Sequence, residues 1–69
     1  MRMINIIMNG QSRTCAPGRT LHDLLAEAGY AQRRVAVEVN REIVPKSLHA
    51  QREIRDGDRI EIVHALGGG

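Results

Sequence analysis

Aromatic residues and cysteines are almost absent from this sequence. Tyr30 is its single aromatic residue and Cys15 its single cysteine. The core must therefore be aliphatic, and neither an internal disulfide nor a cysteine-based zinc site can form. No apolar run reaches about 18 residues, so no segment is expected to span a membrane, and the first five residues are too few and too polar for a signal peptide. We expect a cytoplasmic protein, because a lone cysteine suits a reducing compartment.

Charge of one sign is not concentrated anywhere in the chain. Lys and Arg total 10 against 8 Asp and Glu, and the two signs alternate within short segments such as residues 52–56. Nucleic-acid-binding proteins usually cluster their basic residues or pair them with stacking aromatics, so we expect no nucleic-acid partner. A chain of 69 residues makes one small domain with little room for a large internal pocket. A self-contained enzyme is therefore disfavoured.

Alternating apolar residues predict strands in several parts of the chain. The first covers residues 4–8, and residues 11–15 form its return strand, because Asn9 and Gly10 tolerate the positive φ of a tight hairpin turn. A second hairpin joins residues 35–39 to residues 42–44. Arg41 stands at the second turn position, where glycine is preferred, so we expect that turn to be longer than two residues. The remaining elements are a turn or short helix at 46–51, an isolated apolar anchor at Ile54, a tight turn at 56–58 and a last strand at 59–65.

A single main helix is predicted to begin at Thr20. Thr20 and Asp23 have the spacing of a capping box, and Gly29 can end the helix in a left-handed conformation. Its apolar side chains lie on one face, at Leu21, Leu24, Leu25 and Ala28. One helix packed across one sheet is an α+β arrangement.

Side chains offer little catalytic chemistry. His22, His49 and His64 are not spaced as metal ligands and are expected at the surface or half-buried. The acidic residues at 56–58 lack the other ligands of a calcium loop. Cys15 is expected to be a half-buried structural residue, because no histidine partner is evident in the sequence to activate it. We therefore predict no catalytic side chain, no metal site and no bound cofactor.

The C-terminal glycines are the better candidate for chemistry. Residues 67–69 are all glycine and follow the last predicted strand directly, which predicts a flexible tail after a domain at residues 1–66. Extended, three residues reach roughly 10 Å, enough to place a carboxylate in another protein's active site. An idle, frayed end is the alternative interpretation.

Several segments resemble the sulfur carrier family of thiamine thiazole biosynthesis. The resemblance covers essentially the whole chain, and its most specific segments are Val35-Ala36-Val37-Glu38-Val39-Asn40, Glu42-Ile43-Val44-Pro45, Asp56-Gly57-Asp58-Arg59-Ile60-Glu61-Ile62-Val63 and His64-Ala65-Leu66-Gly67-Gly68-Gly69. The family implies a ubiquitin-like β-grasp fold, with a mixed sheet and one helix across it. Many members end in two glycines, whereas this chain has three.

The resemblance also implies a function as a carrier rather than as an enzyme. An E1-like adenylyltransferase would adenylate Gly69 and consume ATP. A sulfur donor, such as a cysteine desulfurase or a rhodanese-type protein, would then convert Gly69 to a thiocarboxylate for delivery to thiazole synthase. Leu66, Gly67 and Gly68 would thread the partner's active site. The alternatives are the small subunit of molybdopterin synthase, a ubiquitin-like protein modifier, and an unrelated interaction domain.

A docking surface is predicted from the alternation of strand side chains. If Ile4, Ile6, Ile60 and Ile62 face the helix, the residues between them face away from it. The first and last strands are neighbours in a β-grasp sheet, so these outward residues should lie together as an apolar patch beside the tail. The predicted patch consists of Ile7, Val63 and Ala65. Ordinary scattered surface hydrophobic residues are the alternative.

Overall fold

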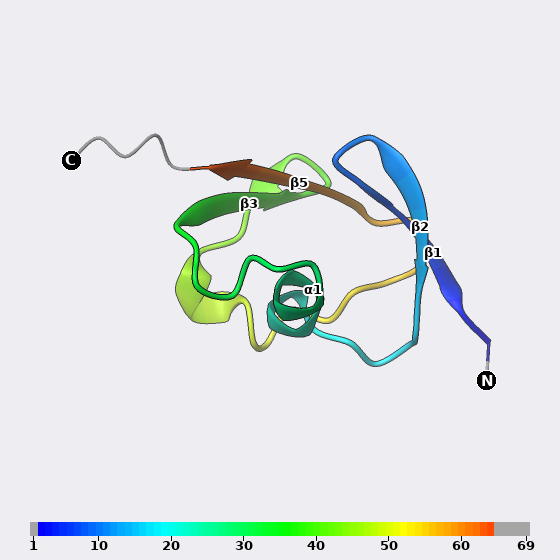
Figure 1. Ribbon diagram of the computed structural model, residues 1–69. Coiled ribbons are helices and arrows are strands. Elements are labelled where there is room, and N and C mark those ends of the chain that lie inside the picture. The colour runs from blue at the N-terminus through cyan, green and yellow to red at the C-terminus, as the bar shows by residue number, and fades with distance from the viewer. Residues whose placement is uncertain (1, 65–69) are drawn as a thin grey trace.

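The computed structural model describes residues 2–64, and within them five strands and one α-helix form an α+β domain (Figure 1). The elements are β1 (Ile4–Met8), β2 (Gln11–Cys15), α1 (Leu21–Glu27), β3 (Val35–Val39), β4 (Glu42–Ile43), the 3-10 helix η1 (Lys46–Leu48) and β5 (Arg59–His64). Their predicted order and type are confirmed. The predicted glycine tail and Ala65 lie outside the described residues.

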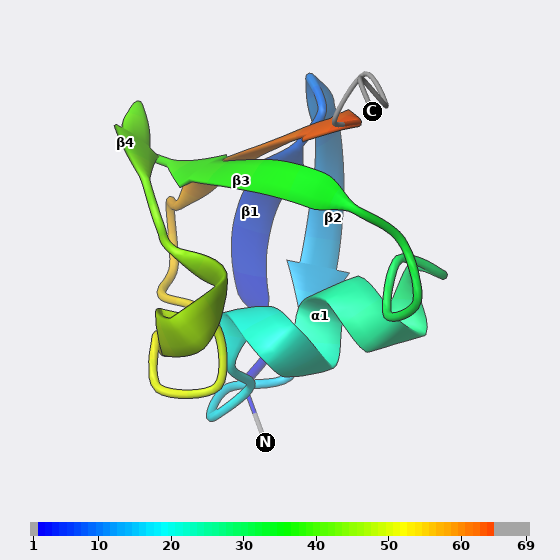
Figure 2. The ribbon, with the colours of Figure 1, turned by 90° about the vertical axis from the view of Figure 1, so that its left-hand side faces the viewer.

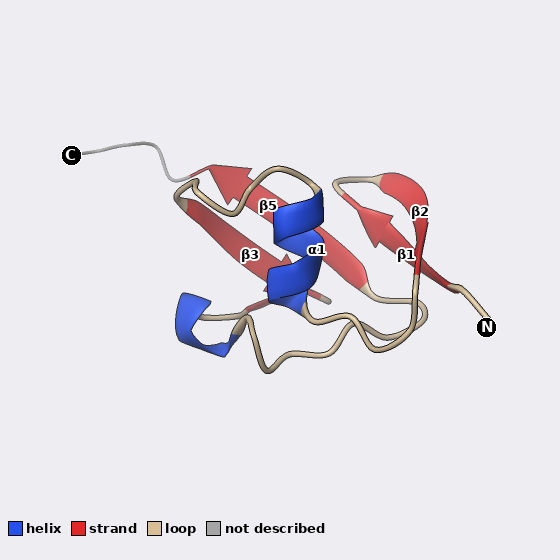
Figure 3. Ribbon diagram, turned by 60° about the horizontal axis from the view of Figure 1, so that its bottom comes forward, coloured by secondary structure: helices blue, strands red, loops and turns tan. Residues whose placement is uncertain are grey.

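The strands of this region form one mixed sheet in the order β2-β1-β5-β3-β4. β1 and β5 run parallel, whereas the β1–β2, β3–β5 and β3–β4 pairs are antiparallel. α1 lies across one face of the sheet (Figures 2 and 3). This is the β-grasp arrangement that the resemblance implies, and it places β5 between β1 and β3 in the middle of the sheet.

Both hairpins turn in two residues. Asn9 and Gly10 have φ angles of 51° and 80°, as predicted. Asn40 and Arg41 have φ angles of 53° and 70°, and Val39 pairs directly with Glu42, so the prediction of a longer second turn is wrong.

The reason lies in the contacts of Asn40. Its side-chain amide donates to Asp58 Oδ1 at 2.9 Å and its side-chain oxygen accepts from the Arg59 N–H at 2.9 Å. Its own backbone N–H donates to the Arg59 carbonyl at 2.8 Å. These bonds fix the turn against β5 and offset the roughly 1 kcal/mol that a left-handed conformation costs a residue such as Arg41.

The helix ends are formed as the sequence predicts. Thr20 Oγ1 accepts from the Asp23 N–H at 3.2 Å, and Asp23 Oδ2 accepts from the Thr20 N–H at 3.0 Å, which is a reciprocal capping box. The hydrogen bond from the Thr20 backbone, joined by the one with the Thr20 side chain, holds the pKa of Asp23 below its ordinary value. Gly29 follows the helix at φ 90°.

The core between α1 and the sheet is aliphatic. Its fully buried side chains are Ile6, Leu21, Leu24, Val37, Ile54 and Ile60. Ile4 and Ile62 are partly buried against this cluster, so the four isoleucines predicted to face the helix do so. Within residues 2–64, no helix is long and apolar enough to cross a membrane.

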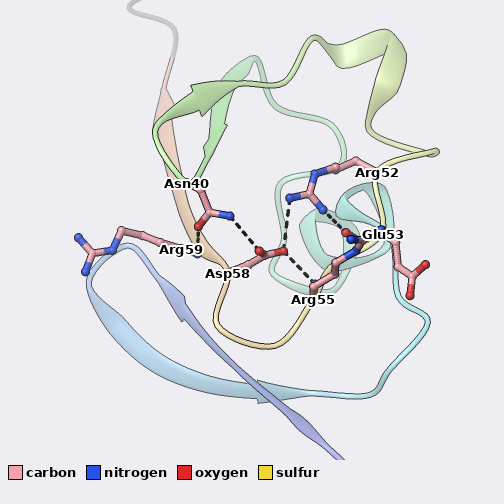
Figure 4. A network of polar contacts seen from close by, with 6 residues as sticks. All are labelled: Asn40, Arg52, Glu53, Arg55, Asp58 and Arg59. Atoms are coloured by element: carbon pink, nitrogen blue, oxygen red, sulfur yellow. Dashed lines mark hydrogen bonds and ion pairs between the residues drawn. The ribbon is translucent and has the colours of Figure 1, made fainter.

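Asp58 is a buried carboxylate at the entrance to β5 (Figure 4). One oxygen accepts from the Asn40 amide, and the other accepts from the Arg55 N–H at 2.8 Å and lies 3.5 Å from the Arg52 guanidinium. The tight turn predicted at residues 56–58 is confirmed, but the sequence did not predict that this aspartate would be buried. Its contacts join the turn to the β3–β4 hairpin and so fix where β5 starts.

Candidate functional site

The end of β5 is the part of the described structure closest in sequence to the predicted tail. His64, the last described residue, pairs with Val35 of β3, and its ring centroid lies 5.8 Å from that of Tyr30. This end of β5 lies on the side of the domain opposite the start of β1 (Figure 1). The chain is therefore held in the sheet up to His64. Leu66, Gly67, Gly68 and Gly69 lie outside the described residues.

The sheet face that points away from α1 carries part of the predicted docking patch. Val63 is 55% exposed and pairs with Ala36, which is also exposed. Ile7 lies on the same face but pairs with Arg59, four residues before Val63. Four strand residues span about 13 Å, so Ile7 and Val63 do not adjoin as predicted. The reason is that β1 pairs only with the beginning of β5.

Other residues on this open face were not predicted as site residues. Glu38 of β3 pairs directly with Glu61 of β5, and Ile43 of β4 pairs with Glu38 on its other side. Ile43 is 70% exposed. The alternation of Val with Glu in residues 37–39, and of Ile with Glu in residues 60–62, was the signal that could have identified the two carboxylates.

Cys15 is more buried than the sequence suggested, with 6% of its surface exposed. Its thiol lies 3.5 Å from the Ala16 carbonyl oxygen, to which it donates. Burial raises the pKa of the Cys15 thiol, and the nearby Glu27 carboxylate adds to this shift. Since the thiolate is the nucleophile, this environment disfavours a role in sulfur transfer.

The resemblance implies that sulfur is accepted at Gly69, so we expect Cys15→Ala to accept it as well as the wild-type protein does. Loss of a small buried side chain should lower the free energy of unfolding by about 1 kcal/mol, which urea denaturation would measure. A folded Cys15→Ala protein that no longer accepts sulfur would show instead that Cys15 relays it.

The histidines do not come together. His49 is buried, contrary to the expected surface or half-buried position, because its ring Nε2 donates to the Val44 carbonyl at 2.9 Å and so keeps a hydrogen bond inside the protein. His22 is exposed, which agrees with the predicted surface or half-buried position. Within residues 2–64, no group of three or more His, Cys, Asp or Glu could hold a metal ion.

Comparison with known proteins identifies consistent relatives. Residues 6–69 match the model of the ThiS family. The sulfur carrier protein ThiS of Escherichia coli is 36% identical over 66 residues, covering 96% of this chain and 100% of that protein. A crystal structure of the thiamine biosynthesis protein ThiS from Geobacter metallireducens has a TM-score of 0.80 and 30% identity, covering 96% of this chain and 100% of that one.

A second kind of relative is longer. A thiazole synthase of Paramagnetospirillum magneticum is 47% identical to this chain over 66 residues, which cover 96% of this chain. The chain spans only 20% of the length of that protein. A second thiazole synthase, from Magnetococcus marinus, is 36% identical over 66 residues, which cover 96% of this chain and 20% of that protein.

Proposed function

Because the chain belongs to the ThiS family, we propose that it is a sulfur carrier of thiamine biosynthesis whose reacting group is the carboxylate of Gly69. The observation that supports this most is the extent of the family match, which runs through the three glycines to residue 69. The proposal requires that Gly69 be the C-terminal residue of the working protein.

Two chemical steps would make the thiocarboxylate. A carboxylate is a poor electrophile, so one Gly69 oxygen first attacks the α-phosphorus of ATP, and pyrophosphate leaves. Sulfide then attacks the carbonyl carbon of the acyl adenylate and expels AMP. If the donor is a persulfide instead, its terminal sulfur forms an acyl disulfide, and a thiol must cleave that S–S bond to give the thiocarboxylate and a disulfide. All catalytic groups belong to the partners in this scheme.

Three partners follow from the proposal. An E1-like adenylyltransferase uses ATP to activate Gly69, and a cysteine desulfurase or rhodanese-type protein supplies sulfur. A thiazole synthase receives the sulfur. The names of the two longer relatives support the last partner, because a segment similar to this chain is part of each. We also propose a cytoplasmic location, since the single cysteine suits a reducing compartment.

ATP–pyrophosphate exchange tests the first step. With its adenylating enzyme, the chain should stimulate exchange in proportion to its concentration. The alternative function as a protein modifier passes through the same adenylate, so cells expressing the chain should also be examined for lysine conjugates. Absence of exchange would contradict the proposal, and abundant conjugates without thiocarboxylate would favour the modifier. If the chain were instead the small subunit of molybdopterin synthase, it would pass its sulfur on within molybdopterin synthase and not to thiazole synthase.

We propose further that partners dock on the open face near the end of β5, through Val63. Val63→Asp should weaken binding to the adenylating enzyme or thiazole synthase by about 10-fold or more, because the charge would be desolvated in the interface. Its free energy of unfolding should change by less than about 1 kcal/mol, since Val63 is 55% exposed.

Ile60→Asp is the matched control for the opposite strand face. Ile60 has 0% of its surface exposed, so the new charge would be buried without a partner and should unfold the protein. Ile62→Asp should fall between the two variants, because Ile62 is only partly buried. Equal unfolding by Val63→Asp and Ile60→Asp would mean that the strand faces are misassigned. Normal binding by a folded Val63→Asp protein would remove the docking role.

A further inference from the structure

Two glutamates occupy directly opposite positions on neighbouring strands in the middle of the sheet. Glu38 of β3 and Glu61 of β5 are cross-strand partners on the face that points away from α1. Side chains in such a pair begin about 5 Å apart, and like charges at this position destabilise a sheet. The free protein therefore carries a repulsion that a neutral residue at either position would remove.

Neither carboxylate is compensated by an ion pair within the described part of the chain. The ion pairs of residues 2–64 join Arg19 to Glu27 and Arg52 to Asp58. The cation that lies closest along β5 on the same face is Arg59, two residues before Glu61. Glu61 is exposed and Glu38 is partly exposed, so both remain accessible to another protein.

Exposed apolar residues flank the two carboxylates. Ile43, the most exposed large hydrophobic residue described, pairs with Glu38. Val63 and Ala36 form the next pair of β3 and β5 on this face toward the end of β5. The open face thus combines an acidic pair at its centre with apolar side chains on two sides. These residues belong to β5, to its neighbour β3 and to β4, which pairs with β3.

We infer that this face binds a partner protein that places a Lys or Arg side chain between Glu38 and Glu61 and apolar side chains against Ile43 and Val63. The inference rests on the proposed function, since the enzyme that receives the tail must contact the domain near the end of β5. A cation between two carboxylates interacts favourably with both and cancels their repulsion. The pair therefore adds to binding and selects for partners with a basic residue at this position.

The inference predicts opposite effects on stability and on binding. Glu38→Gln and Glu61→Gln should each unfold at the wild-type urea concentration or above it, because the cross-strand repulsion is relieved. Each should bind the adenylating enzyme that activates the wild-type protein about 10-fold more weakly at low salt, and the difference should shrink at high salt. Isothermal titration calorimetry at two salt concentrations would measure both effects.

Glu42→Gln is the matched control. It removes the same charge from an exposed glutamate of the sheet, but Glu42 pairs with the buried Val39 and so points to the other side. It should bind as the wild type does. Wild-type affinity of Glu38→Gln and Glu61→Gln, or an equal loss in Glu42→Gln, would overturn the inference.

Failure of this inference and failure of the proposed function can be told apart with the wild-type protein. If the wild type stimulates ATP–pyrophosphate exchange while the two Gln variants bind normally, only the acidic pair loses its assigned role. If the wild type neither binds the enzyme nor supports exchange, the carrier function itself fails, and the partner assigned to this face fails with it.

Discussion

Deletion of Gly69 is expected to reduce thiocarboxylate formation by at least about 100-fold, because misplacement of a reacting group by as little as 1 Å can have that effect. The deletion leaves a glycine carboxylate at residue 68 and so preserves the chemistry of the group. It shortens the reach of the chain by about 3.5 Å. Mass spectrometry of the intact protein after incubation with ATP, adenylating enzyme and sulfide would measure the yield.

Two controls make this deletion specific. Its free energy of unfolding should stay within about 0.5 kcal/mol of the wild type, because glycine contributes no side chain to the core. A variant with one extra glycine after Gly69 displaces the carboxylate by the same distance in the other direction and should also lose yield. A normal thiocarboxylate yield from the shortened protein would mean that Gly69 is not the activated residue.

Asp58→Ala is expected to lower the free energy of unfolding by about 2–4 kcal/mol. The substitution leaves the Arg55 N–H and the Asn40 amide without their acceptor and removes the ion-pair partner of Arg52. Small domains are stable by only about 0.05–0.15 kcal/mol per residue, so this loss is a large fraction of the total. Urea denaturation of the purified protein would measure it.

Asp56→Ala is the matched control in the same turn. Asp56 is exposed and accepts one hydrogen bond, from the Asn5 N–H at 2.8 Å. Its loss should therefore lower stability by about 1 kcal/mol or less. If Asp58→Ala were as stable as Asp56→Ala, the buried network would not be what fixes the start of β5.

Local patterns were sufficient to predict the elements of this fold. The alternation in residues 4–8 and 35–39, and the capping pair Thr20 and Asp23, depend on neighbours in sequence. The face of β5 that meets the helix followed from the same alternation, and Ile60 is fully buried. Such features need no knowledge of how distant segments meet.

The features that the sequence did not predict depend on contacts between distant segments. The two-residue turn at Asn40 and Arg41 is stabilised by Asp58 and Arg59, which lie almost 20 positions further on. The same contacts explain the burial of Asp58, which local sequence identified only as a turn residue. Propensity at Arg41 favoured another turn, and tertiary contacts outweighed it.

The candidate site was predicted unevenly for the same reason. Val63 was assigned correctly to the open face, but the offset between Ile7 and Val63 depends on where β1 and β5 begin to pair. The opposition of Glu38 and Glu61 depends on the register of β3 and β5. Register is a long-range property, so alternation gives the face of a residue without giving its neighbours.

The most direct test of the central claim is to locate the transferred sulfur by mass spectrometry. The protein should be incubated with ATP, its adenylating enzyme and either ordinary or heavy-isotope sulfide, and then fragmented. Replacement of one oxygen by sulfur nearly matches the mass of an oxidised methionine, and the chain has 3 methionines, but only a true product changes mass with the isotope. The carrier function predicts isotope-dependent sulfur on the fragment that ends in Gly69, in both the wild type and Cys15→Ala. Sulfur found only at Cys15, or no isotope-dependent product at all, would contradict it.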